Sequence, residues 1–347
     1  MKNTIRRTTM KRKIAMLMSL LLCLGALAGC GEKEPEGPAD RTELVYDHSN
    51  DAEGEMVMRF IDVVIYNEEG KSSSGRFKAG DATLITFPNG ELMLVDCMAY
   101  TAGSYLVEQL QDMGIDTIDY LVITHNHSDH FGGATSLFNS IKVKQVYMTG
   151  DEGCDIANGD NVARLKNAAQ AQGTPITVLW EGDKLEIGGV NITCYNPPKD
   201  YDFYYADGYV ETRNNSSLCL RFVYNQSSFL LAGDTYSGGE NRLVAAYGKE
   251  LKSDIVKMNH HGYEACNTLS WVRTVEPLLA IATHGVDRGK ELAYFSVGSD
   301  SFYLHADGAV KVSTTGDGKY EAVTQYDRII ETLDTEGQLP GGVYNYG

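Results

Sequence analysis

Short apolar runs recur along the chain, and four of them end at an acidic residue or a histidine. The runs ELMLVDC, YLVITHNH, SFLLAGD and SDIVKMNHH reach Asp96, His125, Asp234 and His260, respectively. Each run has the length and the aliphatic content of a buried strand. We therefore expect four strands that deliver polar side chains to one rim of a sheet.

Helix-like segments and turns separate these runs. Residues 102–114 and 159–173 carry apolar side chains at helical spacing and end at a glycine, which predicts two helices. Four dipeptides typical of hairpin turns follow strand-like runs: Asn89-Gly90, Gly188-Gly189, Asp307-Gly308 and Asp317-Gly318. This mixture predicts an α/β sandwich with mixed sheets rather than a doubly wound parallel sheet.

The first thirty residues have the layout of an export signal. A basic stretch precedes an apolar run that is too short to span a bilayer comfortably, and small residues lead to Cys30. Leu27-Ala28-Gly29-Cys30 resembles the lipobox of bacterial lipoproteins. The resemblance implies a mature chain that is exported and anchored, through lipid on Cys30, to the extracytoplasmic face of the bacterial cell membrane. An ordinary signal peptide that ends near a cysteine is the alternative.

The charge balance bears on the binding partners. The chain has 47 acidic and 30 basic residues, giving a formal charge of −17. Removal of residues 1–29 takes away six basic residues and no acid, which changes −17 to −23. A protein that holds long nucleic acid through its phosphates needs a basic surface, so this charge argues against nucleic acid and favours a small or cationic-headed substrate.

The cysteines beyond Cys30 indicate neither a disulfide framework nor a thiolate zinc site. They are scattered and form no CxxC pair: Cys97, Cys154, Cys194, Cys219 and Cys266. We expect most of them to be small buried residues.

Four residues that commonly bind metals fall within six positions after a strand-like run: His125, His127, Asp129 and His130. Histidines two apart in an extended chain project to the same side, so the first two can share one ion. The chain then turns, and the other two can face a neighbouring ion. Imidazole and carboxylate are the ligands that zinc favours, while iron or manganese fits the same geometry. Gly132-Gly133 allows the following backbone to pack closely.

The stretch THNHSDH resembles the HxHxDH signature of the metallo-β-lactamase superfamily. The resemblance implies an αββα four-layer sandwich with mixed sheets and a one- or two-metal site on the rim of its two sheets. FLLAGD resembles the metal-bridging aspartate of that family, which falls on Asp234. KMNHHG resembles its last metal histidine, which we place on His260, while the sequence leaves the adjacent His261 open as the ligand. Asp96 matches an early aspartate that we expect to support the loops rather than to bind metal.

One departure from the family pattern narrows the resemblance. No histidine occurs from Phe131 to Gly233, and the segment from Asn214 to Phe222 stands where many members supply one. In this respect the chain is similar to the nuclease-like domain of bacterial DNA-uptake competence proteins and to teichoic-acid phosphorylcholine esterases, which act on phosphodiesters. The ligands implied for the first metal are His125, His127 and Asp234. Those implied for the second are Asp129, His130, Asp234 and His260.

The resemblance implies a surface-anchored hydrolase with two divalent ions, zinc before iron or manganese, whose bridging hydroxide attacks a phosphodiester. The substrate would be a small molecule or a component of the cell envelope, of the phosphorylcholine type. Asp129 would orient the nucleophile, and His261 would bind the phosphoryl group or protonate the leaving oxygen. Asn214, Tyr204 and Tyr205 would bind the substrate, since tyrosines can hold a quaternary ammonium by cation–π attraction; the tyrosines can also simply pack the loop.

Two alternatives remain beside this hypothesis: a competence-type extracellular nuclease, and a non-catalytic envelope-binding lipoprotein that keeps the fold. A true β-lactamase fits less well, because the intermediate histidine is missing. Four segments are expected along the chain. They are a lipoprotein signal peptide (1–29), a flexible polar tether (30–55), the metallo-β-lactamase-like hydrolase domain (56–325), and a C-terminal helix and tail (326–347).

Overall fold

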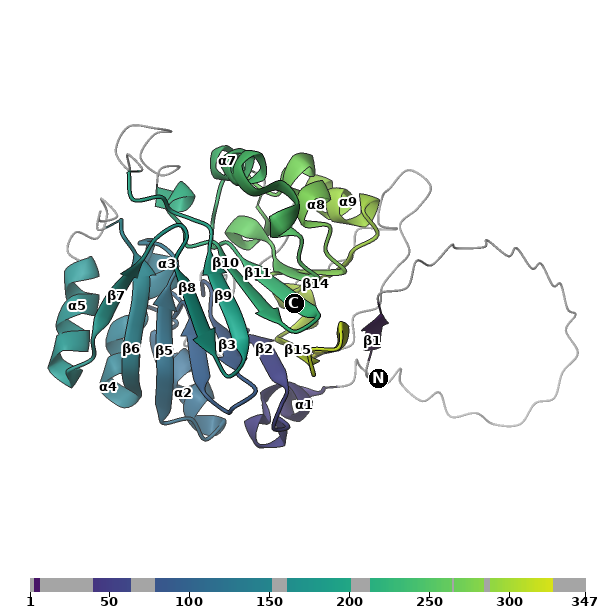
Figure 1. Cartoon of the computed structure of the whole chain (residues 1–347). Helices are drawn as coiled ribbons and strands as arrows, with labels where there is room; N and C mark the ends of the chain where they lie inside the picture. The colour runs from purple at the N-terminus through teal and green to yellow at the C-terminus, as the bar shows by residue number, and fades with distance from the viewer. Residues whose placement is uncertain are drawn as a thin grey trace, which may run out of the picture.

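Two β-sheets pack face to face between two layers of helices (Figure 1). The computed structural model describes residues 3–6, 40–63, 79–151, 161–200, 213–263, 265–283 and 288–326. Within these ranges the predicted α/β sandwich with two mixed sheets is confirmed.

The larger sheet has nine strands in the order β1-β16-β15-β2-β3-β4-β5-β6-β7. Its strands are β1 (Asn3–Arg6), β2 (Met56–Phe60), β3 (Thr83–Thr86), β4 (Leu92–Val95), β5 (Thr117–Ile123), β6 (Lys142–Thr149), β7 (Ile176–Leu179), β15 (Val310–Thr314) and β16 (Lys319–Thr324). From β4 to β7 the neighbouring strands are parallel, and the other pairs are antiparallel. β1 falls within the residues predicted to be a signal peptide.

The smaller sheet has seven strands in the order β14-β13-β12-β11-β10-β9-β8. Its strands are β8 (Lys184–Ile187), β9 (Val190–Cys194), β10 (Leu220–Tyr224), β11 (Ser227–Leu231), β12 (Ile255–Lys257), β13 (Leu279–Ala282) and β14 (Asp300–Tyr303). From β11 to β14 the neighbours are parallel, so this sheet is also mixed.

The helices divide between the two outer faces of the sandwich. The α-helices are α1 (Thr42–Tyr46), α2 (Gly103–Asp112), α3 (Ser128–Phe131), α4 (Ala134–Ser140), α5 (Asn161–Gln172), α7 (Ser237–Tyr247), α8 (Leu269–Val275), α9 (Arg288–Ser296) and α10 (Leu304–Asp307). Short 3₁₀ helices among the described residues are η1 (His48–Asn50), η3 (Gly248–Leu251) and η4 (Asn259–Gly262). Helices α2, α4 and α5 cover the nine-stranded sheet, and α7, α8 and α9 cover the seven-stranded sheet (Figure 1).

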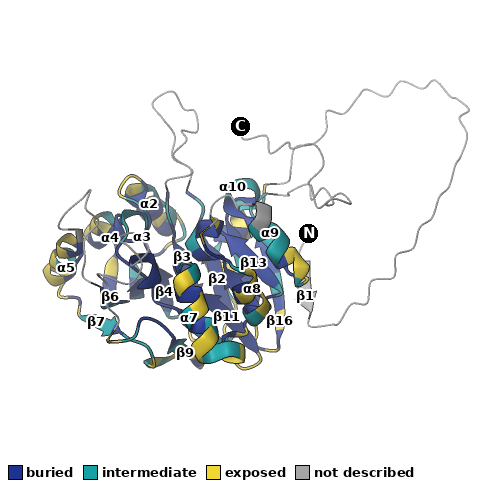
Figure 2. Cartoon of the chain, turned by 90° about the horizontal axis from the view of Figure 1, so that it is seen from above, coloured by how far each residue is buried: buried dark blue, intermediate teal, exposed yellow. Residues whose placement is uncertain are grey.

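Three apolar layers hold the sandwich together. One lies between the nine-stranded sheet and its helices, one between the two sheets, and one between the seven-stranded sheet and its helices. Figure 2 shows the central strands β2, β3, β4 and β11 in the buried class, while exposed residues follow the outer sides of α5 and α7. Trp271 of α8 is fully buried in the third layer. Alternation of strands with helices therefore produced the layers that the sequence pattern predicts.

Most of the predicted local elements are confirmed. Helices α2 and α5 occupy the two segments with helical spacing, and three of the four predicted turns join neighbouring antiparallel strands. The fourth prediction is wrong, because Asp307 ends α10 and the chain then crosses from β14 of one sheet to β15 of the other. The side chain of Asp307 accepts a hydrogen bond from Tyr303 N at 2.6 Å, which closes this helical turn.

A flexible tether was predicted for residues 30–55, but the second half of this segment is packed on the domain. From Asp40 onward the chain packs on the domain: Arg41 Nε donates to Thr324 O at 3.0 Å, and Val45 is fully buried. Arg59 Nε of β2 donates to Val45 O at 2.8 Å. The polar composition concealed these contacts, because within the segment they come from Val45, Tyr46 and Arg41.

Several predictions fall outside the described residues, including the lipid site Cys30, the tyrosines Tyr204 and Tyr205, and the C-terminal helix beyond Tyr326. The four described cysteines of the domain are free and buried, as expected: Cys97, Cys194, Cys219 and Cys266. In the described part of the chain, no helix combines the length and the apolar character needed to cross a membrane.

Candidate metal centre

The predicted residues gather where the ends of strands from both sheets meet. β4 and β5 belong to the nine-stranded sheet, whereas β11 and β12 belong to the seven-stranded one. The strand pattern alone predicted one rim of one sheet, which is wrong, whereas the family resemblance predicted a site on the rim of two sheets, as the structure has it. Parallel strands place their carboxyl ends at the same edge, and here two such edges lie together across the sandwich. The site thus joins the two halves of the fold.

The loop after β5 supplies the first group of side chains. His125 is fully buried, and its Nε2 lies 3.1 Å from Nδ1 of His127, so the two rings share one side of the chain as predicted. His127 precedes α3 in extended conformation, and the helix then places Asp129 in its first turn and His130 at the buried side. The turn from strand to helix thus brings four donor residues into one small volume.

Asp96, which follows β4, fixes the orientation of His130. Its Oδ1 accepts from Thr124 N and its Oδ2 from Thr124 Oγ1, both at 2.8 Å. Nδ1 of His130 donates to Asp96 Oδ2 at 2.7 Å, so Nε2 faces Asp234 Oδ2 at 3.0 Å. A ring nitrogen that donates to a carboxylate leaves the other nitrogen available as a metal ligand. The supporting role predicted for Asp96 is confirmed.

Asp234, three positions beyond β11, lies at the centre of the cluster. Its Oδ2 is 3.0 Å from Nε2 of His130, 3.3 Å from that of His261, 3.7 Å from that of His125 and 3.9 Å from that of His260. One carboxylate oxygen that faces four imidazoles is the arrangement expected of a residue that bridges two metal positions.

His260 and His261 lie in η4, directly after β12, and both have left-handed backbone conformations with φ of 47° and 56°. Non-glycine residues adopt this conformation at an energetic cost, which is common at functional sites. The ring of His261 is deeper, with 7% of the side chain exposed against 23% for His260, and its Nε2 also lies 3.3 Å from Asp129 Oδ2. His261 is thus the inner histidine, beside Asp129, and His260 is the outer one, while the sequence left the choice of ligand between them open with His260 preferred.

Two buried residues of the site are absent from the sequence prediction. Asp81, just before β3, accepts from Nδ1 of His261 at 2.8 Å, and Lys257 of β12 lies against it with Nζ 2.5 Å from Oδ2. Lys257 lies inside the KMNHHG motif, and a lysine at the end of an apolar strand could have indicated a buried residue of the site. Asp81 had no comparable signal, because its partner is 180 positions away.

The buried charges shift the titration of the cluster. Burial lowers the pKa of His125 and of His260. Burial acts in the same direction on His130 and His261, but nearby carboxylates, with Asp234 first, outweigh it and raise both pKa values well above the usual range. Burial would raise the pKa of Asp234, but the charges of His130 and His261 hold it well below that range. The imidazoles and carboxylates of this cluster therefore shift one another's pKa values in opposite directions.

The donor set fits a divalent metal ion. Four buried residues offer ligand atoms that all lie within 4.8 Å of one another: Asp81, His130, Asp234 and His261. Asp234 Oδ1 is also buried and accepts no hydrogen bond. Imidazole nitrogen and carboxylate oxygen suit zinc and other first-row divalent metals. The described chain thus contains a buried histidine and aspartate cluster of the kind that binds metal.

Close backbone approaches explain two glycines at the site. A Cβ on Gly133 would lie 2.1 Å from the carbonyl oxygen of Cys97, which confirms the close packing predicted after the histidine motif. Gly80, with φ of 83°, brings the loop before β3 against Asp129, where a Cβ would lie 1.8 Å from the carbonyl oxygen. Only glycine fits at either position without moving the backbone.

Some of the residues around the outer face of the metal cluster, where a substrate would approach, are described by the structure. Asn214 is fully buried, and its side-chain amide atoms have no hydrogen-bond partner among the described residues. The adjacent Asn215 accepts from Tyr236 N at 3.0 Å. The rings of Tyr236 and Tyr263 lie 4.9 Å and 5.4 Å from that of His260, and Tyr263 is 40% exposed. Aromatic rings therefore flank the outer histidine.

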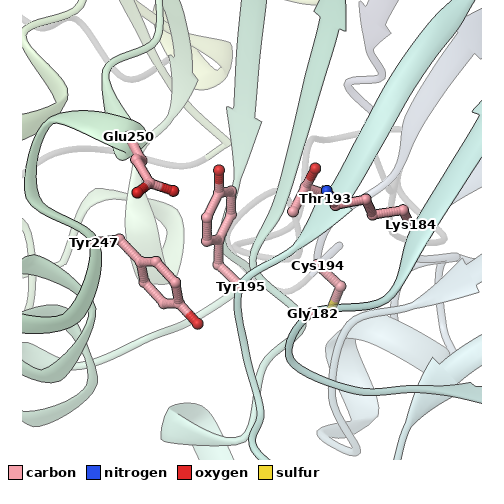
Figure 3. Close-up of a pocket in the computed structure, with 7 residues that line it drawn as sticks. All are labelled: Gly182, Lys184, Thr193, Cys194, Tyr195, Tyr247 and Glu250. Carbon is pink, nitrogen blue, oxygen red and sulfur yellow. The ribbon is translucent and has the colours of Figure 1, made fainter.

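A separate pocket of about 220 Å³ lies at the outer part of the seven-stranded sheet, beside α7 and η3 (Figure 3). Tyr195 and Tyr247 contact each other edge to face across 4.6 Å, with Glu250 near them and Lys184 at the opposite side. None of the predicted site residues lines this pocket.

Comparison with known proteins gives one family match. Residues 75–194 match the metallo-beta-lactamase superfamily. ComE operon protein 3 of Bacillus subtilis (strain 168) is 27% identical over 180 residues, which cover 52% of this chain and 22% of that protein. Competence protein ComA of Neisseria gonorrhoeae is 24% identical over 206 residues, or 59% of this chain and 26% of that protein. The chain thus spans about a quarter of the length of these relatives.

Two further similarities are more limited. Anti-Pycsar protein Apyc1 of Bacillus phage vB_BveM-Goe7 is 38% identical over 66 residues, 18% of this chain and 23% of that protein. The metallo-beta-lactamase fold protein YhfI from Bacillus subtilis matches with a TM-score of 0.47 and 10% identity, over 71% of this chain and 95% of that chain. Residues 75–194 thus resemble the metallo-β-lactamase superfamily, the chain is related over part of its length to ComE operon protein 3 and competence protein ComA, and the described residues add two mixed sheets and a buried histidine and aspartate cluster.

Proposed function

We propose that the chain is a metal-dependent phosphodiesterase whose substrate is a small molecule or a component of the cell envelope. The observation that carries the proposal is the convergence of four imidazoles on Asp234 Oδ2, with no histidine contributed from the long interval before that aspartate. Such a centre combines nitrogen and oxygen donors with fewer protein ligands than a fully closed site. Positions that the protein does not fill are available to a phosphoryl group.

The residues divide into ligands and groups that act on the substrate. The candidate ligands of two divalent ions are His125, His127, Asp129, His130, Asp234 and His261. Divalent ions bound there would supply Lewis acidity toward a phosphoryl oxygen and acidify a water molecule. Asp129 is 39% exposed at its side chain, so it can also accept a hydrogen bond from an attacking water. His260 is the outermost histidine, and its position suits proton donation to the leaving oxygen.

The substrate class follows from charge and from the rim of the site. Tyr236 and Tyr263 flank His260, and aromatic faces attract quaternary ammonium groups. The acidic balance of the chain favours a cationic or small substrate over a polyanion. Export and lipidation at Cys30 would place the enzyme on the extracytoplasmic face of the membrane, where phosphorylcholine-type envelope components are accessible.

A second candidate function is supported by the relatives. Two competence proteins match more than half of this chain, so an extracellular nuclease is the alternative to an envelope phosphodiesterase. The two hypotheses share the same phosphoryl chemistry and differ in the substrate that reaches the metal centre.

A comparison of four substrates tests the proposal with the zinc-loaded chain. We expect turnover of bis(p-nitrophenyl) phosphate and of p-nitrophenyl phosphorylcholine, but not of single-stranded DNA or nitrocefin. Asp234→Asn removes the central carboxylate and should lower kcat/KM at least about a hundredfold, since ligand loss exceeds the effect of supporting residues. Turnover of nitrocefin alone would contradict the proposal, and cleavage of DNA without the choline ester would favour the nuclease.

A further inference from the structure

A buried lysine lies against the metal centre. Lys257 ends β12, and only 3% of its side chain is exposed. Its Nζ is 2.5 Å from Asp81 Oδ2 and 3.6 Å from Asp234 Oδ1, and it donates to Gly233 O at 3.1 Å. Lysine is almost never fully buried unless it is paired. The ammonium group therefore has a specific place between the residue before β3 and the turn after β11.

Asp81 connects Lys257 to His261. One carboxylate oxygen accepts from Nδ1 of His261 at 2.8 Å, and the other faces the lysine. With both oxygens engaged in this way, Asp81 holds the imidazole ring rather than competing for the metal position. The ring then directs Nε2 toward Asp234 Oδ2 and Asp129 Oδ2, each at 3.3 Å.

The arrangement has a counterpart on the other side of the cluster. His130 is held through Nδ1 by Asp96, whose oxygens are in turn fixed by the neutral donors of Thr124. Both inner histidines therefore rest on a buried aspartate. They differ in what restrains the aspartate, which is a threonine in one case and the lysine charge in the other. Because of this difference, the support of His261 by Lys257 and Asp81 can be tested separately from that of His130.

We propose that Lys257 is a positioning residue of the metal centre. It restrains Asp81, which sets the orientation of the His261 ring, and it holds the Gly233 carbonyl beside the central aspartate. The pair of Lys257 and Asp81 carries no net charge, so it acts on a bound cation through the geometry of His261 rather than through attraction or repulsion. The inference rests on the metal-binding part of the proposed function and is independent of the substrate.

Zinc affinity of the metal-stripped full chain tests the role of Lys257, measured by competition with a chromophoric chelator. Lys257→Met should weaken zinc binding about 10- to 100-fold, the usual effect of residues that orient ligands. Arg59→Met is the matched control, because it removes a fully buried cation that contacts Asp51 and lies outside the cluster. We expect this control to lose stability but to bind zinc within about twofold of the wild type.

A double variant tests whether the lysine acts through Asp81. Asp81→Asn should also weaken zinc binding. The zinc affinity of the double variant should equal that of the more strongly impaired single variant, because both substitutions act on His261. Lys257→Met with unchanged or tighter zinc binding, or losses that simply add, would overturn the proposal.

If Lys257→Met does not fold, the zinc affinity of Asp81→Asn is compared with that of the Arg59→Met control to test the proposal. Asparagine preserves the buried volume of Asp81, so this variant should fold. Wild-type affinity in Asp81→Asn then overturns the proposal. Failure of the wild-type chain to bind zinc would instead contradict the proposed function.

Discussion

Asp51 shows how a single buried carboxylate can stabilise a junction. Its side chain is 4% exposed, accepts from Arg59 Nη1 at 2.7 Å and from Thr86 Oγ1 at 2.9 Å, and lies 3.2 Å from Lys311 Nζ. These contacts join the segment after α1 to strands β2, β3 and β15. Burial would raise the pKa of Asp51, but hydrogen bonds from His48 and Arg59 and the charge of Arg59 outweigh it and lower the pKa.

Asp51→Asn should destabilise the chain by about 3–5 kcal/mol at neutral pH, because Arg59 is left as a buried charge without its partner. A lowered pKa means that the stabilisation is fully present above the unfolded-state pKa of about 4 and is lost as the pH falls below it. Urea unfolding of both proteins at pH 7, 5, 4 and 3 measures this. A difference in stability that grows toward low pH would contradict the assignment.

At the level of elements, Glu240 joins α7 to the segment that carries His260 and His261. The side chain is fully buried, and its oxygens accept from Asn259 Nδ2 at 2.7 Å and from Thr268 N at 2.8 Å, as well as from Asn267 N. These donors belong to η4 and to the start of α8. The position of His260 and His261 therefore depends on a helix that contributes no ligand.

Glu240→Ala should lower the free energy of unfolding by about 3 kcal/mol or more, since it leaves several buried donors without an acceptor. It should also reduce zinc affinity, because η4 loses its attachment to α7. Thermal unfolding and zinc titration measure the two effects. Glu108→Ala, at an exposed position of α2, is the control and should change stability by less than about 0.5 kcal/mol. Equal zinc affinity in both variants would contradict this role.

The sequence predicted individual strands and helices better than it predicted which of them lie next to one another in the fold. Strands that end at Asp96, His125 and Asp234 were recognisable because apolar runs of strand length stop at a polar residue. The division of these strands between two sheets was not recognisable, because pairing depends on residues far apart in the chain. Asp81 was missed for the same reason. Which of His260 and His261 lies deeper in the site depends on the left-handed backbone conformation of both residues, which sequence propensities do not indicate.

For the whole molecule, the metal centre couples ligand binding to stability. The mature chain should bind close to two divalent ions, as measured by metal analysis. Removal of zinc with a chelator should lower the melting temperature by several degrees and zinc should restore it, because ligand at a hundred times its Kd stabilises by about 2.7 kcal/mol. Asp234→Asn should show no zinc-dependent shift. An unchanged melting temperature in the wild type would contradict a structural contribution of the metal.

The division of the site between the two sheets also sets the order in which it can form during synthesis. His130 and Asp234 are 104 positions apart, and Asp81 and His261 are 180 apart. Contacts that close such long loops form late, after local helices and hairpins. The histidines after β5 leave the ribosome well before their partners beyond β11 and β12, so a partly made chain presents only half of the donors. A metal ion is therefore expected to bind with full affinity only once the two halves of the fold have docked.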